Sequence, residues 1–318
     1  MPTLTADPAL DHLSDADRSV PVWQPDPRAA QDRATQDYLF DLHGFTILRG
    51  ALDDRDLAEI NAFVDAHPAE SLEPGQWIGD VETHRYGVSD GINFQNIIEG
   101  GPVFERLIDH PAWYERVKRY IENGAHHLTI DENFLNVRQS GGFIPMHSGG
   151  NTVRFTSCFR NYAGRWMVGQ INVLMALADT GYGDGCTTVI PGSHRVVEDH
   201  PEDRHPDGHA YGRGVPASQA AGMFQVHLNA GDALMFTDAL THGSMPRMNP
   251  GERRVMIYRY APHLMAKRFN YIPSPELLAR LTDRRCAMVQ SQPPRMRPGR
   301  VIEFKHDDGP REFQGQRI

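Results

Sequence analysis

The chain has 318 residues, of which 40% are hydrophobic and 23% are charged, a composition typical of one large globular domain with extensions. Its formal net charge of −9 gives no positive field that would favour a nucleic acid polymer or an anionic membrane as a partner. No apolar run approaches the roughly 20 residues that span a bilayer, so we expect no membrane segment.

Two further features concern the cellular compartment. Residues 1–17 are acidic and lack both the basic region and the apolar region of a signal peptide. The three cysteines, Cys158, Cys186 and Cys286, are scattered and odd in number, which is typical of a reducing compartment rather than of a disulfide framework. Together these features predict a cytoplasmic protein.

The first predicted elements are helices around one strand. Residues 1–30 are rich in Pro, Asp and Ala without periodicity, so we expect a loose N-terminal arm. Residues 41–50 are predicted to form a strand that is entered through Gly44. Asp53 is expected to cap a helix with one apolar face, and His110 followed by Pro111 opens a second helix.

From residue 128 onward the pattern changes to short apolar or alternating runs. They are separated by turn signals, without helices between them, which predicts an antiparallel sandwich or barrel. The predicted strands are 128–137, 171–177, 187–190, 224–228, 233–236 and 254–260. A short helix over 274–281 and an irregular Arg- and Pro-rich tail over 284–300 follow. We therefore expect a mainly β domain with flanking helices (α+β) over 31–270, after the arm 1–30 and before a C-terminal region 271–318.

Two histidine segments carry the predicted chemistry. His147 lies in Ile144-Pro-Met-His-Ser-Gly-Gly150, and His242 lies in Thr241-His-Gly243 after a short apolar strand. Two histidines and one carboxylate on one face of the metal are the usual ligands of a non-haem iron oxygenase. The carboxylate normally stands two residues after the first histidine, and this chain has Gly149 there.

An arginine follows the second histidine after a predicted turn. Arg253 comes eleven residues after His242, and a turn at Asn249-Pro-Gly251 lets the chain return antiparallel and bring Arg253 to the same cavity. A planar guanidinium binds a carboxylate through two hydrogen bonds, which suits the distal carboxylate of a keto-acid cosubstrate.

These residues resemble the phytanoyl-CoA dioxygenase family of iron(II)/2-oxoglutarate-dependent oxygenases. The likeness extends over about residues 40–262 and is carried by Met146-His147, Gly183-Asp-Gly-Cys186, Val189-Ile-Pro-Gly-Ser-His-Arg195, Thr241-His-Gly243 and Arg253. The resemblance implies a double-stranded β-helix, or jelly roll. It also implies Fe(II) and 2-oxoglutarate as cofactors and an enzyme that oxidises, typically hydroxylates, an aliphatic C–H bond of a small molecule while 2-oxoglutarate is decarboxylated to succinate.

The resemblance assigns His147 and His242 to the metal and Arg253 to 2-oxoglutarate. Arg254 points to the opposite side of the strand, because side chains alternate; with the register shifted by one residue, Arg254 would take the anchoring role. Gln170 and Asn172, two residues apart on one strand, are expected to face the cavity and bind 2-oxoglutarate.

Gly149 leaves three alternatives open. A carboxylate from elsewhere, Asp238 first and Asp184 second, completes the iron site of a hydroxylase. Alternatively, chloride binds in the open position beside Gly149 and the enzyme is an iron(II)/2-oxoglutarate-dependent halogenase, whose His-x-Gly motif is similar to His147-Ser-Gly149. The third alternative is an inactive binding module.

The predicted substrate is a small molecule, with an anionic one as an option because several arginines surround the first motif, namely Arg138, Arg154, Arg160 and Arg165. His194 is expected to shape the mouth of the site rather than to bind metal. A cupin-like protein would need a denser ligand set such as His-x-His, which does not occur in the sequence.

Overall fold

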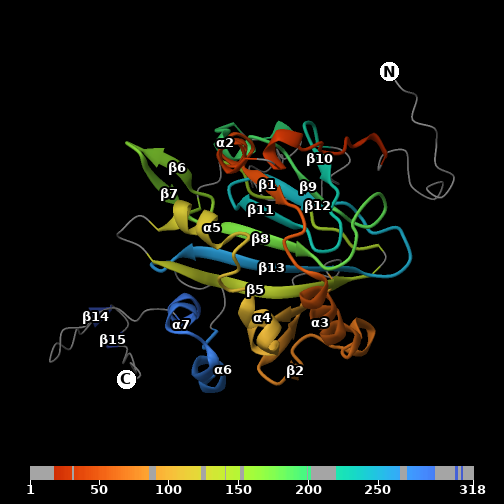
Figure 1. The fold of residues 1–318 in the computed structure, drawn as a ribbon, viewed down its shortest axis with the longest axis vertical. Helices are drawn as coiled ribbons and strands as arrows, with labels where there is room; N and C mark the ends of the chain where they lie inside the picture. The colour runs from red at the N-terminus through yellow and green to blue at the C-terminus, as the bar shows by residue number, and fades with distance from the viewer. Residues whose placement is uncertain are drawn as a thin grey trace.

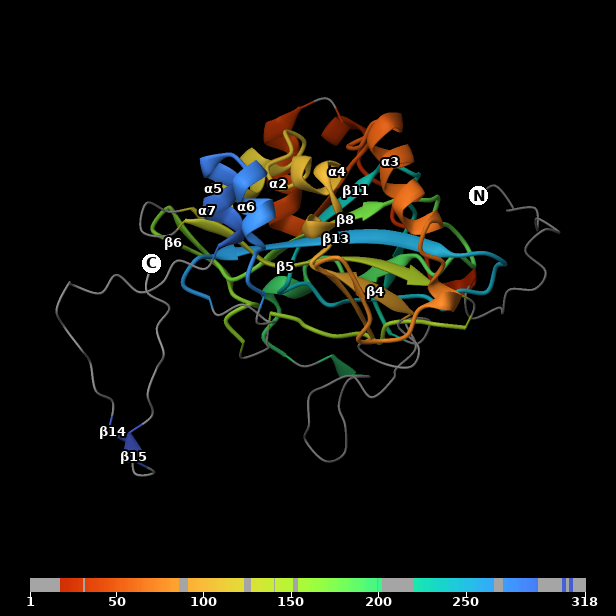
Figure 2. The ribbon, with the colours of Figure 1, turned by 90° about the horizontal axis from the view of Figure 1, so that it is seen from below.

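The computed structural model describes residues 18–30, 32–85, 91–122, 127–139, 141–150, 154–198, 200–201, 220–265 and 271–290, together with the backbone of 305–306 and 309–310. Two antiparallel sheets face each other as in a jelly roll, and helices cover the outer face of the larger sheet (Figures 1 and 2). This arrangement confirms the predicted fold class.

The larger sheet has eight strands. In spatial order they are β1 (Phe45–Leu48), β11 (Ala233–Thr237), β8 (Ile171–Ala176), β13 (Arg253–Pro262), β5 (Leu128–Arg138), β4 (Ile92–Gln95), β3 (Val81–His84) and β2 (Trp77–Ile78). The smaller sheet has the order β10 (Phe224–Val226), β9 (Thr187–Val189), β12 (His242–Ser244). Separate pairs are formed by β6 (Phe159–Tyr162) with β7 (Arg165–Val168), and by β14 (Lys305–His306) with β15 (Gly309–Pro310).

The helices lie on one side of the larger sheet in Figure 2. They are α2 (Arg33–His43), α3 (Asp54–Asp65), α4 (Pro102–Arg106), α5 (Tyr114–Ile121), α6 (Pro275–Arg280) and α7 (Asp283–Val289), with 3-10 turns η2 (Pro27–Ala30), η3 (Ala69–Ser71), η4 (Ile97–Gly100) and η5 (Ser193–Arg195). The main apolar core fills the space between helices and sheet. Two buried tyrosines of β13 bind the helical layer to the sheet. Tyr258 donates to the Phe104 carbonyl oxygen (2.7 Å), and Tyr260 accepts from the Trp113 indole (2.8 Å).

Most predicted elements after residue 50 are confirmed. Asp53 caps α3 by accepting a hydrogen bond from the Asp56 amide (2.8 Å). The six predicted strands correspond to β5, β8, β9, β10, β11 and β13. Ser274 caps α6 through the Leu277 amide.

Three segments differ from the prediction. Residues 41–43 end α2 instead of starting a strand, because Gly44 at φ 84° provides the left-handed residue that terminates a helix. Residues 283–289 form α7, capped by Thr282, where an irregular tail was expected. Of the predicted arm, residues 1–17 lie outside the described residues, whereas Val20 is buried and Val22 pairs with Gln225.

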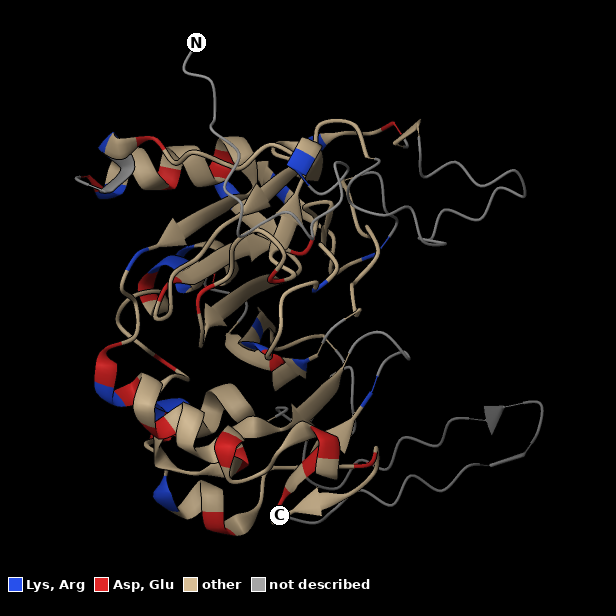
Figure 3. Ribbon diagram, turned by 90° about the vertical axis from the view of Figure 1, so that its right-hand side faces the viewer, with Lys and Arg blue, Asp and Glu red and all other residues tan. Residues whose placement is uncertain are grey.

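Charged residues follow the same layering. Lys, Arg, Asp and Glu lie mainly on the helices and loops, while most of the strands carry uncharged residues (Figure 3). All three cysteines are free thiols. Among the helices of the described ranges, none has the length and apolar character needed to cross a bilayer.

Candidate metal and cosubstrate site

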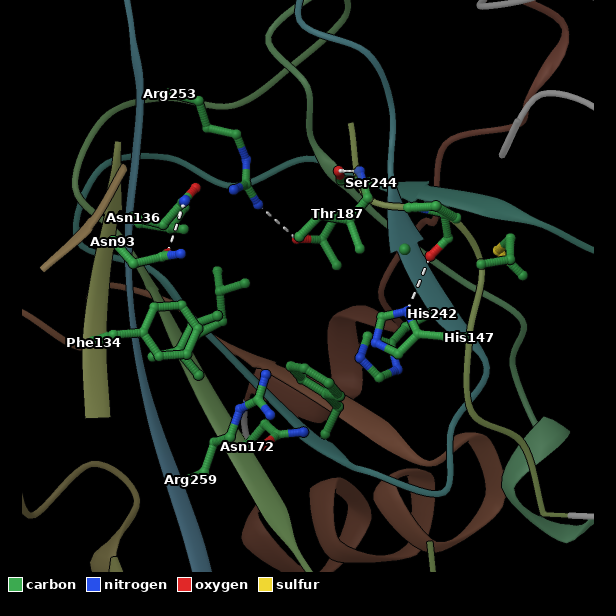
Figure 4. Close-up of a pocket in the computed structure, with 18 residues that line it drawn as sticks. Asn93, Phe134, Asn136, His147, Asn172, Thr187, His242, Ser244, Arg253 and Arg259 are labelled. Carbon is green, nitrogen blue, oxygen red and sulfur yellow. Dashed lines mark hydrogen bonds between the residues drawn. The ribbon is translucent and has the colours of Figure 1, made fainter. Parts of the chain in front are cut away.

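A cavity of about 330 Å³ lies between the two sheets. The larger sheet contributes side chains of β4, β5, β8, β11 and β13, and the smaller sheet contributes β9 and β12 (Figure 4). Half of the residues that line it are apolar or glycine, and the other half have polar side chains that could fix the orientation of a small molecule. The polar side chains are Asn93, Asn136, His147, Asn172, Thr187, His242, Ser244, Arg253 and Arg259.

His147 and His242 are brought together by backbone pairing. The His147 amide donates to the His242 carbonyl oxygen (2.9 Å) and the His242 amide donates to that of His147 (3.1 Å). The imidazole centroids are 4.1 Å apart, and both rings line the cavity. Two imidazoles that lie 95 residues apart in the sequence therefore lie side by side in the same cavity.

Backbone carbonyls fix the orientation of both rings. His147 Nδ1 lies 2.9 Å from the Pro145 carbonyl oxygen, and His242 Nδ1 lies 2.7 Å from that of Leu240. A carbonyl oxygen only accepts hydrogen bonds, so each Nδ1 carries the proton and each Nε2 keeps its lone pair. Burial, and next the neighbouring His147, lower the pKa of His242 to about 3. His242 is therefore neutral at physiological pH, the form in which imidazole binds metal.

Gly243 makes this close approach possible. A Cβ atom on residue 243 would lie 2.8 Å from the Ile144 carbonyl oxygen and 3.1 Å from that of Pro145. The segment 144–147 can pair with β12 because residue 243 has no side chain.

Gly149 has a backbone that suits glycine. Its φ is 132°, a value that residues with a side chain rarely adopt, and the preceding Ser148 is itself at φ 67°. Across the described ranges, no three His, Cys, Asp or Glu side chains gather as a metal-binding group. Within the described residues, the histidine pair is therefore not part of a three-residue group of this kind.

Asp238 lies near this pair but binds elsewhere. It is buried, and its Oδ1 accepts a hydrogen bond from Asn172 Nδ2 (3.3 Å). Its charge acts on His242 by raising the pKa of that imidazole, against the larger effect of burial. Asp184 is a turn residue outside the cavity lining, where it accepts from Asn249 (2.8 Å) and pairs with Arg247 (3.5 Å).

The two arginines of β13 face opposite sides, as strand alternation requires. Arg253 is buried and lines the cavity, where it donates to Thr187 Oγ1 (3.2 Å). Arg254 points to α3 and pairs with Asp65 (2.7 Å) and Glu252 (2.9 Å). Arg253 therefore faces the cavity, and the register shift that would place Arg254 there does not occur.

Arg253 is a buried cation without a carboxylate. In the described part of the chain no ion pair includes it, and its Nε has no hydrogen-bond partner. Burial, reinforced by the Arg138 guanidinium, lowers the pKa of Arg253 to about 9. The arrangement is suited to a bound anion, which would supply the missing partner.

Of the two amide side chains predicted to face the cavity, only one does. Asn172 lines the cavity, whereas Gln170 is outside its lining and donates to Asp131 (2.9 Å). His194 is also outside the lining, with Nε2 3.0 Å from the Asp41 carbonyl oxygen.

Several lining residues were missed from the sequence. Ser244 and Arg259 had an available signal, because each is an even number of residues from a predicted one (His242, Arg253) on the same strand. Asn93 and Asn136 face the cavity through the pairing of β4 with β5, which local sequence does not reveal.

The chain is similar to several known proteins. Over 271 residues the chain is 27% identical to 1-deoxypentalenic acid 11-beta-hydroxylase of Streptomyces exfoliatus, covering 77% of this chain and 87% of that protein. The fold is shared with HygX of Streptomyces hygroscopicus, solved with nickel and 2-oxoglutarate (19% identity, TM-score 0.61, 77% and 93% covered). It is also shared with AviO1 of Streptomyces viridochromogenes (19% identity, TM-score 0.51, 77% and 98% covered).

Residues 40–255 match the phytanoyl-CoA dioxygenase family, which is more than half of the chain. This confirms the family inferred from the histidine, Pro-Gly-Ser-His and arginine motifs. The chain belongs to the phytanoyl-CoA dioxygenase family of iron(II)/2-oxoglutarate-dependent oxygenases.

Proposed function

We propose that this protein hydroxylates an aliphatic C–H bond of a small molecule, with Fe(II) held by His147 and His242 and 2-oxoglutarate anchored by Arg253. The observation that carries the proposal is the convergence of two lone-pair Nε2 atoms and one uncompensated buried guanidinium on one cavity. The related hydroxylase from Streptomyces exfoliatus supports hydroxylation as the reaction.

The donor set fits the two cofactors. Imidazole nitrogen is a ligand that iron accepts readily, and the Nδ1 contacts to backbone carbonyls fix both rings for it. The unpartnered Nε of Arg253 fits the distal carboxylate of 2-oxoglutarate. Ser244 Oγ accepts from Arg138 (2.7 Å) and from the Ile144 amide (2.8 Å), so its own proton is available to the same carboxylate.

The bound metal and cosubstrate supply the oxidation: R–H, O₂ and 2-oxoglutarate give R–OH, succinate and CO₂. The protein positions and shields these reactants. Phe236, Leu174 and Val255 form apolar walls that keep water from the reacting centre, and the paired backbones of β12 and residues 144–147 hold both imidazoles rigidly.

Succinate formation tests the proposal. The purified protein with Fe(II), ascorbate and O₂ is expected to convert 2-oxoglutarate to succinate slowly without substrate, and faster with a C–H substrate. Absence of both succinate formation and 2-oxoglutarate binding would contradict it and favour an inactive binding module.

Halogenation is the second candidate, favoured by Gly149. The backbone at this residue, φ 132°, is one that an aspartate would adopt only under strain, so the position is built without a carboxylate. Chloride on the metal would replace it, and R–H, Cl⁻, O₂ and 2-oxoglutarate would give R–Cl, succinate, CO₂ and hydroxide. A product that contains only the hydroxyl group at saturating chloride would remove this candidate.

Replacing Gly149 by Asp separates the two candidates. A halogenase is expected to lose chlorination, since a carboxylate takes the halide position, while a hydroxylase keeps its product. Gly149→Ala is the matched control, because it carries the same backbone strain, on the order of 1–3 kcal/mol, without a carboxylate. Mass spectrometry of the product gives the readout; equal chlorination by the Asp and Ala variants would contradict a halide site at this position.

Asp238 is the proposed third ligand of the hydroxylase, and Asp238→Ala tests it. If the carboxylate moves onto the metal, iron affinity is expected to fall by at least about tenfold. Asp238→Asn is the control, because it retains an acceptor for Asn172 while it removes the charge. Titration with Fe(II) under anaerobic conditions measures the affinity; an unchanged value in both variants would exclude Asp238 as a ligand.

A further inference from the structure

The two ends of the cavity differ in their charged groups. Arg253 and Arg259 lie six residues apart on β13 and face the same side, with Val255 and Ile257 between them. In Figure 4 they stand at opposite ends of the cavity, with Phe134 between them and both histidines to one side. The cavity thus has an Arg253 end and an Arg259 end.

The Arg253 end is cationic. Arg138 is the neighbouring charge that lowers the pKa of Arg253, and in the described ranges no Asp or Glu lines the cavity. A dianionic cosubstrate is therefore drawn to this end.

The Arg259 end is electrically balanced. Arg259 pairs with Glu132 at 3.1 Å, and the Glu132 side chain is fully buried behind it. Gln95 Nε2 donates to the same carboxylate (3.2 Å), and the Arg259 guanidinium lies 5.5 Å from the centroid of the Phe134 ring. These contacts hold the guanidinium in the wall, where it keeps N–H groups at the cavity while its charge is neutralised.

Two asparagines, Asn172 and Asn93, are the neighbouring polar groups of the cavity wall. Asn172, opposite Arg259 in the strand register, is bound to the carboxylate of Asp238. Asn93 accepts from Asn136 Nδ2 (3.0 Å), and its own Nδ2 has no partner within the described residues although Asn93 is 1% exposed. The wall therefore offers hydrogen-bond donors from Arg259 and Asn93 beside one acceptor, Asn172 Oδ1, and the carboxylates of Glu132 and Asp238 bind the arginine and the asparagine amide.

We propose that Glu132 is a specificity-determining residue, which makes Arg259 select an uncharged hydrogen-bond acceptor of the substrate, such as a carbonyl or amide oxygen, over a carboxylate. A substrate carboxylate at this position would gain contact with Arg259 and be repelled by the buried Glu132 charge. A substrate cation would contact the Arg259 guanidinium directly and be repelled by its charge. An uncharged acceptor receives the N–H donors without either penalty, while the aliphatic body of the substrate contacts Phe134, Leu174 and Ile257.

This inference rests on the proposed function, because it assigns the Arg253 end to 2-oxoglutarate. The test uses protein loaded with Ni(II) and saturating 2-oxoglutarate, so that the Arg253 end is filled. The probes are matched pairs at neutral pH: hexanamide with hexanoate, and cyclohexanecarboxamide with cyclohexanecarboxylate. Isothermal titration calorimetry gives the dissociation constant of each.

The wild type is expected to bind the amide at least about tenfold more tightly than the carboxylate, which corresponds to roughly 1.4 kcal/mol. Glu132→Gln is expected to reverse the preference, because Arg259 then presents its full charge. Glu252→Gln is the matched control, since Glu252 pairs with Arg254 on the opposite face of β13, and it leaves the ratio unchanged.

The double variant Glu132→Gln/Arg259→Gln guards against a loss of folding from an unpaired buried charge. It is expected to bind both probes weakly and with little preference. A wild type that prefers the carboxylate, that binds neither probe, or whose ratio is unchanged by Glu132→Gln would overturn the inference. Failure to bind Ni(II) and 2-oxoglutarate at all would instead refute the proposed function.

Discussion

Replacing His242 by Ala is expected to abolish turnover and to lower the affinity for Fe(II) by more than about 100-fold. Loss of a group that merely orients a metal ligand typically costs 10- to 100-fold, and loss of a direct ligand costs at least the upper end. The effect is large because only one imidazole of the pair then remains, and among the described residues no group of three His, Cys, Asp or Glu side chains is found that could hold the metal without it.

His227→Ala is the control for this variant. His227 is also partly buried, but it lies outside the cavity lining and contacts Gln225 Oε1 at 3.3 Å. Anaerobic titration with Fe(II) and measurement of succinate are expected to show normal behaviour for His227→Ala. Retained iron binding and turnover in His242→Ala would refute the proposed metal site.

Replacing Arg253 by Met is expected to raise the 2-oxoglutarate concentration at half-maximal rate by roughly 100-fold. Loss of one partner from a buried charge pair costs about 2–5 kcal/mol, and each 1.4 kcal/mol is tenfold in affinity. Arg254→Met is the matched control on the opposite face of β13, where Arg254 pairs with Asp65 and Glu252.

The thermal stability of the cofactor-free protein distinguishes a binding role from a structural one. Arg253 is buried without a carboxylate partner in the described part of the chain, so Arg253→Met is expected to leave the melting temperature unchanged or to raise it. An arginine that held the fold together would show the opposite. A marked drop in melting temperature with unchanged 2-oxoglutarate affinity would contradict the anchoring role.

The pH dependence of 2-oxoglutarate binding follows from the same residue. Arg253 has its pKa lowered to about 9, so it keeps its charge at all lower pH values. Affinity is expected to stay constant from about pH 6 to 8 and to decline as the pH rises through the pKa. The bound carboxylate stabilises the charged form and raises the pKa of Arg253 in the complex, so the decline in affinity begins near the pKa of the free protein, about 9, and continues up to the higher pKa of the complex.

The sequence alone predicted that His147, His242 and Arg253 lie in one cavity, but it predicted less of the remaining lining. His147, His242 and Arg253 were recognisable because each is embedded in a local pattern: a glycine that permits close backbone approach, or a turn that returns the chain. Strand alternation correctly separated Arg253 from Arg254, because that rule needs no knowledge of tertiary contacts.

Contacts that arise only from the pairing of strands far apart in the sequence were not predicted. Asn93 faces the cavity because β4 pairs with β5, and Glu132 meets Arg259 because β5 pairs with β13. Neither pairing is encoded in a short segment. The position of Gln170 was also not predictable from the local sequence. It lies just before β8 and donates a hydrogen bond to Asp131, outside the cavity lining.

A structure of the protein with Fe(II) and 2-oxoglutarate, prepared without oxygen, tests the central proposal most directly. We expect iron on Nε2 of both His147 and His242 and the distal carboxylate of 2-oxoglutarate on Arg253. Density beside Gly149 would then reveal water, chloride or the Asp238 carboxylate as the remaining ligand. Iron bound away from the histidine pair, or 2-oxoglutarate anchored at Arg259, would contradict the account.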